Sequence, residues 1–459
     1  MTGPKAGTRV HFVGVGGIGM SALAELLLLR GCTVTGTDRT ASPLTNRLVD
    51  LGIQVGIGHR AEAVSQADLV IYTPAVSPDN PELAEAARRG LPTMKRAALL
   101  GLLARDQQVV AVTGTHGKTT TTAMTGAVLK AAGMDPTILV GGIVQGDERN
   151  FIPGSGSTWV LEADEYDRSF HELQPHVAVV TSLEADHLDA YGSMDAIVDA
   201  YRTFLAGMPA GVAVLNGDAP SVAALPLPAG VVRRTFGLVD GDVHAGDVTG
   251  EGTATRFPVL EDRRPAAQIE LRLPGRHNVM NALAAASVGR SLGVPWDSIA
   301  EGLAGFQGVH RRFEVVGEAA GVTVVSDYAH HPTAIAETLK TAKERRQSGR
   351  VVVLFQPHLY SRTRDFAEAF GEALALADRV FVTDVYAARE TPIPGVDGAL
   401  LAQETVHAGQ PAVTSVPALA EAVDRVVADV RSGDMLLVIG AGDVESAAPA
   451  ILQRLLSSE

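Results

Sequence analysis

The sequence predicts an α/β protein with parallel sheets. Short runs of β-branched residues alternate with Ala- and Leu-rich stretches of helical length along the whole chain. Strands separated by helices in this way pair in parallel, because each crossover helix returns the chain to the same end of the sheet. The chain has 459 residues. At about 150 residues per domain, this length predicts roughly three domains.

The elements expected in order form three sets, with domain boundaries near residues 105 and 311. A linker-like segment at 104–106 ends the first set, and the third begins just beyond the cluster at 308–312. A polar, Gly-rich stretch at 237–256 predicts turns and short strands. The expected strands are 9–15, 33–37 and 69–73 in the first set, 108–113, 159–161, 177–181 and 212–215 in the second, and 322–326, 351–355, 379–383 and 435–439 in the third.

The composition predicts a folded, acidic protein. Hydrophobic residues make up 46% of the chain, and 38 Lys and Arg face 52 Asp and Glu, for a formal charge of -14. Nucleic acid is therefore not an expected partner, since binding it requires many cationic contacts to phosphates. The single cysteine, Cys32, excludes an intramolecular disulfide. No apolar run approaches the roughly 20 residues that span a bilayer, and the start lacks a signal peptide's apolar core. We expect a cytoplasmic monomer or homodimer without membrane insertion.

A glycine loop, GVGGIG at 14–19, follows the first expected strand and opens a helix. In this context glycines let backbone N–H groups approach a diphosphate at the positive end of the helix. Asp38 stands at the end of the next strand. The pattern fits a nicotinamide or flavin cofactor and equally another nucleotide diphosphate, while a plain tight turn is the structural alternative.

A second phosphate loop is predicted at 114–120, with the sequence GTHGKTT. Lys118 supplies a charge for the β and γ phosphates, and the Thr119 hydroxyl is placed to ligate Mg²⁺. The alternative is a solvated lysine at the start of a helix. Two such loops in successive domains indicate two bound nucleotides, whereas an oxidoreductase needs one. The pattern therefore favours a reaction in which ATP activates a second, nucleotide-linked substrate.

Two acidic clusters follow neighbouring strands of the second set. They read EADEYD at 162–167 and EADHLD at 184–189. Sites gather at the carboxyl ends of parallel strands, and Mg²⁺ prefers oxygen ligands, so at least one carboxylate of the first cluster is expected to bind metal. His187 in the second cluster is a candidate ligand, although a lone histidine is more often a surface or core residue.

Three further motifs lie nearer the C-terminus. The asparagines of LPGRHNVMN (273–281) serve as helix caps or contact a nucleotide base, and the sequence alone favours capping. DYAHHP (327–332) and FQPHLYSRTR (355–364) each end a strand of the third set, so both point to one sheet edge. Arg362 and Arg364 suit a bidentate clamp on a carboxylate, with solubilisation of the surface as the alternative.

Taken together in this order, the motifs resemble the Mur ligases, and most closely the branch of the family that adds alanine. The resemblance rests on GVGGIG, GTHGKTT, EADEYD, EADHLD, GRHNVMNA, HRRFE, DYAHHPT, FQPHLYSRTRDF and GAGD, which span essentially the whole chain. It implies a Rossmann-like N-terminal domain (1–104) for the UDP substrate, a central P-loop ATPase-type α/β domain (105–311), and a C-terminal Rossmann-like domain (312–459) for the amino acid. The implied reaction is ATP-dependent amide formation between L-alanine and UDP-N-acetylmuramate, with Mg²⁺, in peptidoglycan synthesis.

The resemblance also implies roles for individual residues. Catalytic groups are Lys118, Glu162, His187 and His331, and the metal ligands are Thr119, Glu162 and His187. ATP binding falls to Gly114, Thr115, His116, Gly117, Lys118, Thr119, Thr120, Asn278, Asn281, Arg312 and Asp327. The UDP-sugar is assigned to Gly14, Gly16, Gly17, Ile18, Gly19, Asp38, Ser77 and His187, and the amino acid to His358, Arg362 and Arg364.

Two alternatives remain at this stage. Leu359 stands where many family members have arginine, so one expected contact to the amino-acid carboxylate is missing and falls to Arg362 alone. Tyr166 replaces a common serine, and the resulting EADEYD also occurs in ligases that add a preformed tripeptide to the same sugar nucleotide. The first alternative is therefore a murein-peptide recycling ligase. The second is an NAD-dependent oxidoreductase, which rests only on the segment from Gly14 to Asp38.

Overall fold

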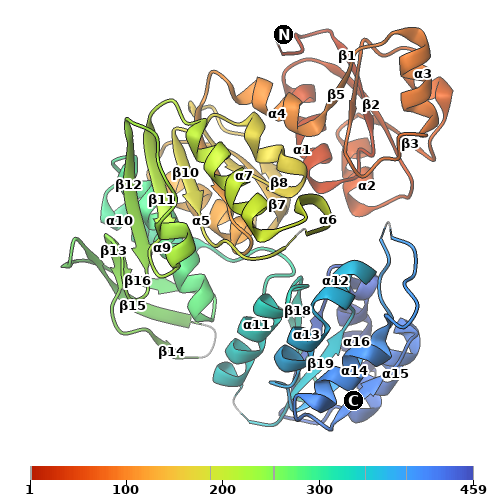
Figure 1. The fold of residues 1–459 in the computed structure, drawn as a ribbon, viewed down its shortest axis with the longest axis vertical. Helices are drawn as coiled ribbons and strands as arrows, with labels where there is room; N and C mark the ends of the chain where they lie inside the picture. The colour runs from red at the N-terminus through yellow and green to blue at the C-terminus, as the bar shows by residue number, and fades with distance from the viewer. Residues whose placement is uncertain (1–2, 187, 252–253, 347, 389, 458–459) are drawn as a thin grey trace. The chain divides into compact units, whose positions relative to one another are not determined.

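A computed structural model describes residues 3–186, 188–251, 254–346, 348–388 and 390–457, and its strands form three sheets flanked by helices (Figure 1). This architecture confirms the predicted α/β class. The chain packs into two compact units. One comprises Met1–Gly246, Pro258–Ile269 and Met280–Phe306, and the other comprises Asp247–Phe257, Glu270–Val279 and Gln307–Glu459. No described helix combines the length and the apolar character needed to cross a membrane.

The first sheet has five parallel strands in the order β3-β2-β1-β4-β5. This order places the loop after β1 beside the loop after β2, as in half of a Rossmann fold. Its strands are β1 (Arg9–Val13), β2 (Thr33–Asp38), β3 (Gln54–Ile57), β4 (Leu69–Tyr72) and β5 (Thr93–Lys95). Its helices are α1 (Ile18–Leu29), α2 (Pro43–Asp50), η1 (Ala61–Val64), α3 (Pro81–Arg89) and α4 (Arg96–Ala104).

The central sheet runs β14-β15-β13-β12-β11-β10-β6-β9-β7-β8, with β16 beside β15. Strands β6, β9 and β10 are nearly wholly buried, as expected for parallel strands covered on both faces. The strands are β6 (Gln108–Thr113), β7 (Thr137–Val144), β8 (Arg149–Ile152), β9 (Thr158–Glu162), β10 (Val177–Val180), β11 (Gly211–Asn216), β12 (Val231–Gly237), β13 (Val243–Ala245), β14 (Thr249–Glu251), β15 (Ala254–Glu261) and β16 (Arg264–Leu271).

Seven helices accompany the central sheet among the described residues. They are α5 (Lys118–Ala131), η2 (Tyr166–Glu172), α6 (Leu188–Tyr191), α7 (Met194–Ala206), α8 (Pro220–Ala223), α9 (Arg276–Ser291) and α10 (Trp296–Gly305). Phe170 of η2 and Tyr201 of α7 share one apolar core with Leu99 of α4. The first sheet and the central sheet are therefore joined by continuous apolar packing.

The third sheet, in the other unit, has the order β17-β18-β22-β19-β20-β21. All its pairs are parallel except β17 with β18. Its strands are β17 (Glu314–Ala319), β18 (Val322–Asp327), β19 (Val351–Phe355), β20 (Arg379–Val382), β21 (Val413–Ser415) and β22 (Met435–Ile439). Its helices are α11 (Pro332–Arg345), α12 (Tyr360–Asp365), α13 (Ala367–Leu374), α14 (Gly398–His407), α15 (Leu419–Asp429), η3 (Asp443–Ser446) and α16 (Ala447–Leu456).

The structure departs from the predicted all-parallel pairing at the sheet edges. Strand β8 is antiparallel to β7, and β13 and β14 are antiparallel to β15. A short turn connects β7 to β8, and a short turn returns the chain antiparallel, whereas parallel pairing needs a long crossover. The turns and short strands predicted at 237–256 are present. The boundary predicted near residue 105 lies between α4 and β6, inside the first unit, and the division at 1–104, 105–311 and 312–459 stays a prediction.

Helix α5, which carries the second phosphate loop, packs closely on α10 through Gly302. A Cβ atom added there would lie 2.7 Å from Val128 Cα and 2.8 Å from the Ala127 carbonyl oxygen, both backbone atoms of α5. Gly305 ends the same helix, and a Cβ added there meets nothing within 4 Å. The two glycines therefore form a matched pair on one helix.

We predict that Gly302→Ala lowers the free energy of unfolding by about 1–3 kcal/mol, because an extra methyl group forces the helices apart. Gly305→Ala should change it by less than about 1 kcal/mol, and in the stabilising direction, since alanine restricts the unfolded chain. Urea unfolding of both variants measures the difference. Equal stability of the two would show that α5 and α10 are not in close contact at Gly302.

Candidate active site

The second phosphate loop connects β6 to α5. Gly114 has φ 134° and Gly117 has φ 81°, in the left-handed region where a glycine avoids strain. Gly117 is the N-cap residue of α5, so the positive end of this helix faces the loop. Thr119 and Thr120 are buried in its first turn. The glycine conformations and the helix N-terminus give this loop the backbone geometry that suits an anion.

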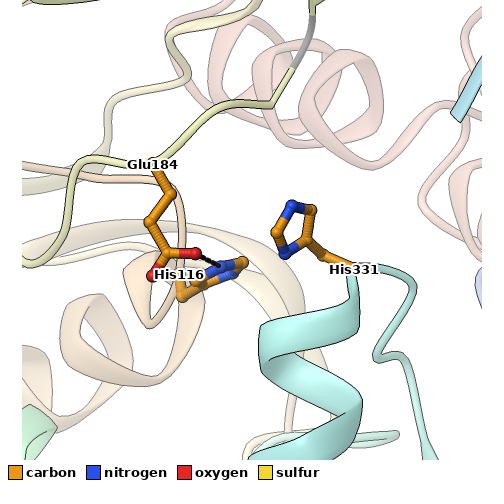
Figure 2. Close-up of side chains that lie close together, drawn as sticks. All are labelled: His116, Glu184 and His331. Atoms are coloured by element: carbon orange, nitrogen blue, oxygen red, sulfur yellow. Dashed lines mark hydrogen bonds and ion pairs between the residues drawn. The ribbon is translucent and has the colours of Figure 1, made fainter. Parts of the chain in front are cut away.

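The chain that follows the neighbouring strand β10 holds this loop in place. The Thr181 hydroxyl donates to the carbonyl oxygens of Thr113 and His116. The His116 backbone N–H donates to Ser182 Oγ at 2.8 Å, and the Glu184 N–H donates to Thr115 Oγ1 at 2.9 Å. His116 Nε2 also lies 3.3 Å from Glu184 Oε2 (Figure 2). The loop shape is therefore fixed before any ligand binds.

Lys118 turns its side chain back over the loop. Its Nζ donates to the Gly114 carbonyl oxygen at 2.6 Å and to Glu165 Oε1 at 2.7 Å. Burial lowers the pKa of Lys118, but the carboxylates of Glu165, Asp164 and Glu162 outweigh this effect and raise it. The ammonium group is therefore firmly charged although it is only 15% exposed.

The candidate metal ligands Thr119 and Glu162 lie together. Thr119 Oγ1 donates to Glu162 Oε1 at 3.2 Å, and the backbone N–H of Gly141, on β7, donates to Glu162 Oε2 at 2.7 Å. A Cβ at residue 141 would lie 2.3 Å from Glu162 Oε1, so this strand approaches the carboxylate as only glycine allows. A hydroxyl and a carboxylate are oxygen donors that fit Mg²⁺. His187, the third candidate, lies outside the described residues.

The two asparagines of helix α9 have different surroundings. Asn281 Oδ1 accepts from Thr121 Oγ1 at 3.1 Å, and a Cβ at Gly117 would lie 2.5 Å from the same oxygen, so Asn281 is beside the phosphate loop. Asn278 Nδ2 donates to the Pro274 carbonyl oxygen at 2.7 Å. In this contact the side chain donates to a carbonyl oxygen, whereas a helix N-cap accepts a backbone N–H, so the capping role stays a prediction.

The first glycine loop lies between β1 and α1. Gly14 has φ 82°, and the Gly16 N–H donates to Asp38 Oδ2 at 2.8 Å, so Asp38 is drawn to the loop itself. Gly17 is the N-cap of α1, which begins at Ile18. Ser77 lies in the turn between β4 and α3, where its Oγ accepts from Asp79 N–H. The structure therefore brings Asp38 to the glycines.

Basic residues at the start of α4 connect this loop to the first acidic cluster. Gly19 is so close to Arg96 that a Cβ there would lie 2.8 Å from the guanidinium Nη1. Arg96 lies 4.0 Å from Asp164, and Lys95 Nζ lies 2.9 Å from Asp167 Oδ2. The acidic cluster thus contacts the first sheet as well as the phosphate loop.

In the other unit, Asp327 ends β18 and is buried. Its carboxylate accepts N–H groups from Phe313 at 2.8 Å and Ala329 at 2.7 Å. Burial raises the pKa of Asp327, against the lowering effects of Arg312 and of these two hydrogen bonds. The guanidinium of Arg312 lies over the Tyr328 ring, 5.0 Å from its centroid. His331 follows as the N-cap of α11 and is buried (Figure 2).

The candidate amino-acid residues divide into a close pair, His358 and Arg362, and an exposed residue, Arg364. His358 Nδ1 lies 3.4 Å from Arg362 Nη1, and the His358 ring stacks on Tyr386 with centroids 5.8 Å apart. Arg362 is buried, whereas Arg364 is 55% exposed and pairs with Asp365. The structure brings His358 and Arg362 together and leaves Arg364 on the surface, where the solubilising alternative applies.

Comparison with known proteins identifies the family. The chain matches the models named Mur ligase family, catalytic domain (residues 9–108), Mur ligase middle domain (112–289) and Mur ligase, glutamate ligase domain (311–442). It is 46% identical to a protein of Salinibacter ruber named UDP-N-acetylmuramate–L-alanine ligase, over 97% of this chain and 95% of that protein. The chain belongs to the Mur ligase family. Mur ligases are ATP-dependent ligases.

Other relatives of this Mur ligase agree. A UDP-N-acetylmuramate–L-alanine ligase of Kineococcus radiotolerans is 45% identical over 99% of both chains. The crystal structure of UDP-N-acetylmuramate-alanine ligase from Thermotoga maritima superposes with a TM-score of 0.85, at 33% identity, over 98% of this chain and 100% of that chain. A murein peptide ligase from Psychrobacter arcticus, 24% identical over 98% and 99% of the two chains with a TM-score of 0.74, shares the fold.

Some residues that shape this Mur ligase site escaped the sequence analysis. Thr181 and Ser182 hold the phosphate loop, and Gly141 approaches Glu162. The apolar run before Thr181 and the pair of glycines at 141–142 were visible signals. Their partners, however, depend on which strands are neighbours, and local sequence does not specify that order.

We predict that Thr181→Val raises the KM for ATP by up to about tenfold, since the variant loses the one hydroxyl proton shared between the Thr113 and His116 carbonyl oxygens, and a hydrogen bond contributes roughly 0.5–1.5 kcal/mol. Thr181→Ser keeps the hydroxyl and is the control. Steady-state kinetics with ATP as the varied substrate measures both. An unchanged KM in the valine variant would contradict the view that the Thr181 hydroxyl sets the shape of the loop.

Proposed function

We propose that this chain joins L-alanine to the lactyl carboxylate of UDP-N-acetylmuramate, consuming ATP and releasing ADP and phosphate, in peptidoglycan synthesis. The observation that carries this proposal is the identity of 43–46% over nearly the full chain to several proteins named UDP-N-acetylmuramate–L-alanine ligase. The phosphate loop beside two acidic clusters supplies the chemistry that such a reaction needs. The need for ATP supports the expected cytoplasmic location.

The proposed reaction has two steps. A lactyl carboxylate oxygen attacks the γ-phosphorus of ATP, and the bond between that phosphorus and the oxygen bridging to the β-phosphate breaks. The products of this step are an acyl phosphate and ADP. The uncharged amine of alanine then attacks the acyl carbon, a tetrahedral intermediate forms, phosphate leaves, and the nitrogen loses a proton to give the amide. The protein forms no covalent bond to substrate, so its work is positioning and charge stabilisation.

Lys118 and the loop amides are the groups proposed to bind the phosphates. The charged Nζ offsets the negative charge on the oxygens of the transferring phosphoryl group, and the helix N-terminus at Gly117 adds to this effect. Thr119 and Glu162 are proposed to hold Mg²⁺, and their oxygen donors fit it. A bound Mg²⁺ neutralises phosphate charge.

The remaining assignments are proposals of the same kind. The first glycine loop with Asp38 and Ser77 takes the UDP moiety, and Asn278 and Asn281 take the adenine.

The other assignments concern the reacting groups. Arg312 serves the ATP phosphates, and Asp327 serves the ribose. His187 serves the metal and the sugar nucleotide, and His331 binds the reacting carboxylate. His358 and Arg362 take the alanine carboxylate. A monomer or homodimer remains the expected state in solution.

A tripeptide-adding ligase is the alternative with a specific observation in its favour. The structure of UDP-N-acetylmuramate:L-alanyl-gamma-D-glutamyl-meso-diaminopimelate ligase from Neisseria meningitidis is 30% identical, with a TM-score of 0.61, over 67% of this chain and 100% of that chain. The relatives named for alanine addition are more similar over more of the chain, so we favour alanine. The NAD-dependent oxidoreductase is not favoured, because a Mur ligase uses a glycine loop like that at 14–19 without redox chemistry.

We predict that purified protein with ATP, Mg²⁺ and UDP-N-acetylmuramate releases ADP rapidly with L-alanine, and at least about a hundredfold more slowly with the murein tripeptide or without acceptor. A coupled ADP assay measures all three. Turnover restricted to the tripeptide would assign the protein to peptide recycling instead. Saturable NADH binding without ADP release would favour the oxidoreductase alternative.

We predict that Lys118→Ala abolishes ADP release, a loss of at least about 10³-fold, because nothing else in the loop supplies a positive side chain to the phosphates. Lys130→Ala is the matched control, since Lys130 lies near the end of the same helix and pairs with exposed Asp147. Circular dichroism checks that both variants fold. Turnover by Lys118→Ala at the wild-type rate would refute the proposed mechanism.

A further inference from the structure

Glu165 is a buried acid that the proposed mechanism does not use. It belongs to the first acidic cluster, 162–167, and its side chain is 5% exposed. Its Oε1 lies 2.7 Å from Lys118 Nζ. Its other oxygen, Oε2, is buried and has no hydrogen-bond partner among the residues the structure describes. A buried carboxylate is costly without such a partner, so its position calls for a functional reason.

Glu165 accepts a hydrogen bond from Lys118, the side chain proposed to bind the ATP phosphates. An ammonium group has three N–H donors. Lys118 Nζ lies within hydrogen-bond distance of three oxygens, those of Gly114 at 2.6 Å, Glu165 at 2.7 Å and Thr115 at 3.4 Å. All three donors therefore face protein oxygens, and a phosphate must displace at least one of them.

Glu165 is held by its backbone rather than by its side chain. Its carbonyl oxygen accepts from the Tyr191 hydroxyl and from the Arg168 backbone N–H. The two residues after Tyr166, Asp167 and Arg168, have positive φ, which fixes a tight turn beyond it. The carboxylate can therefore lose Lys118 without the loop losing its shape.

We propose that Glu165 is a positioning residue that acts through Lys118: it is the counter-ion that holds the ammonium group while the site lacks nucleotide, and the ATP phosphates displace it. This inference rests on the proposed function, because it assumes that the loop at 114–120 binds nucleotide phosphates. In the resting site Glu165 holds the ammonium group of Lys118 across the loop and is one of three carboxylates that favour its charged form. Nucleotide binding then exchanges one anionic partner of the lysine for another.

The electrostatics agree with such an exchange. Burial raises the pKa of Glu165 to about 7, although Lys118 opposes this and Asp164 adds to it. The groups that face Glu165 from the neighbouring elements are Lys118 on α5, Tyr191 on α6 and Tyr201 on α7. When phosphate draws Lys118 away, the one cation among them no longer stabilises the carboxylate. Glu165 should then take up a proton from solvent.

The decisive variant is Glu165→Gln, which keeps the shape and removes the charge. Asp164 and Glu162 remain near Lys118, so the lysine stays charged. If Glu165 competes with phosphate, the variant binds ATP about tenfold more tightly at pH 8, a change of about 1.4 kcal/mol. Calorimetric titration with ATP, with and without Mg²⁺ and without the other substrates, measures this dissociation constant. Asp167→Asn removes one charge from the same loop at an exposed position paired with Lys95, and should stay within about twofold of wild type.

The sign of the effect separates this role from a structural one. If Glu165 only supports the loop, its replacement weakens ATP binding, and that result or an unchanged constant overturns the inference. A second measurement needs no variant: titrations of the wild type in Pipes and in Tris report proton uptake, expected as a fraction of a proton per ATP near pH 7.5, and its absence also overturns the inference. If the wild type binds no ATP at all, it is the proposed function that fails.

Discussion

Parallel pairing of β10, β6 and β9 is the constraint on which the site depends. In the register of this sheet Val112 is opposite Glu162, and Thr113 is opposite Val180. The three strands therefore end at one level, and the loops that leave them meet. The glycine loop at 114–120, the carboxylate of Glu162 and the hydroxyl of Thr181 come from segments far apart in sequence, and this strand pairing brings them together.

Much of this arrangement was predictable because it follows from strand ends. Continuous apolar runs marked β6, β9 and β10, and the glycines and charged residues directly after them marked the site. The class of fold and the convergence of Lys118 with Glu162 follow from those signals. The features at the edge of the sheet did not follow from the sequence. Strand β8 turns back on β7, and Gly141 reaches Glu162 across β7 and β9, which are joined only through tertiary pairing.

The balance of charge around Lys118 was also beyond sequence reasoning. Six residues, EADEYD, include four acids, and sequence spacing does not say which of them face the loop. In the structure Glu162 faces Thr119, Glu165 faces Lys118, and Asp164 and Asp167 turn to Arg96 and Lys95. The exposed pairs contribute little stability individually. Their effect is orientation, because they hold one acidic segment between two sheets.

The protonation of Lys118 also affects how chemical probes would react with it. Acylating and aldehyde reagents attack the neutral amine, and a lysine whose pKa is raised by neighbouring carboxylates presents very little of that form at neutral pH. Electrophilic compounds aimed at Lys118 would therefore label surface lysines first. A compound that carries an acidic group matched to the ammonium ion has better prospects than one that relies on a covalent bond to it.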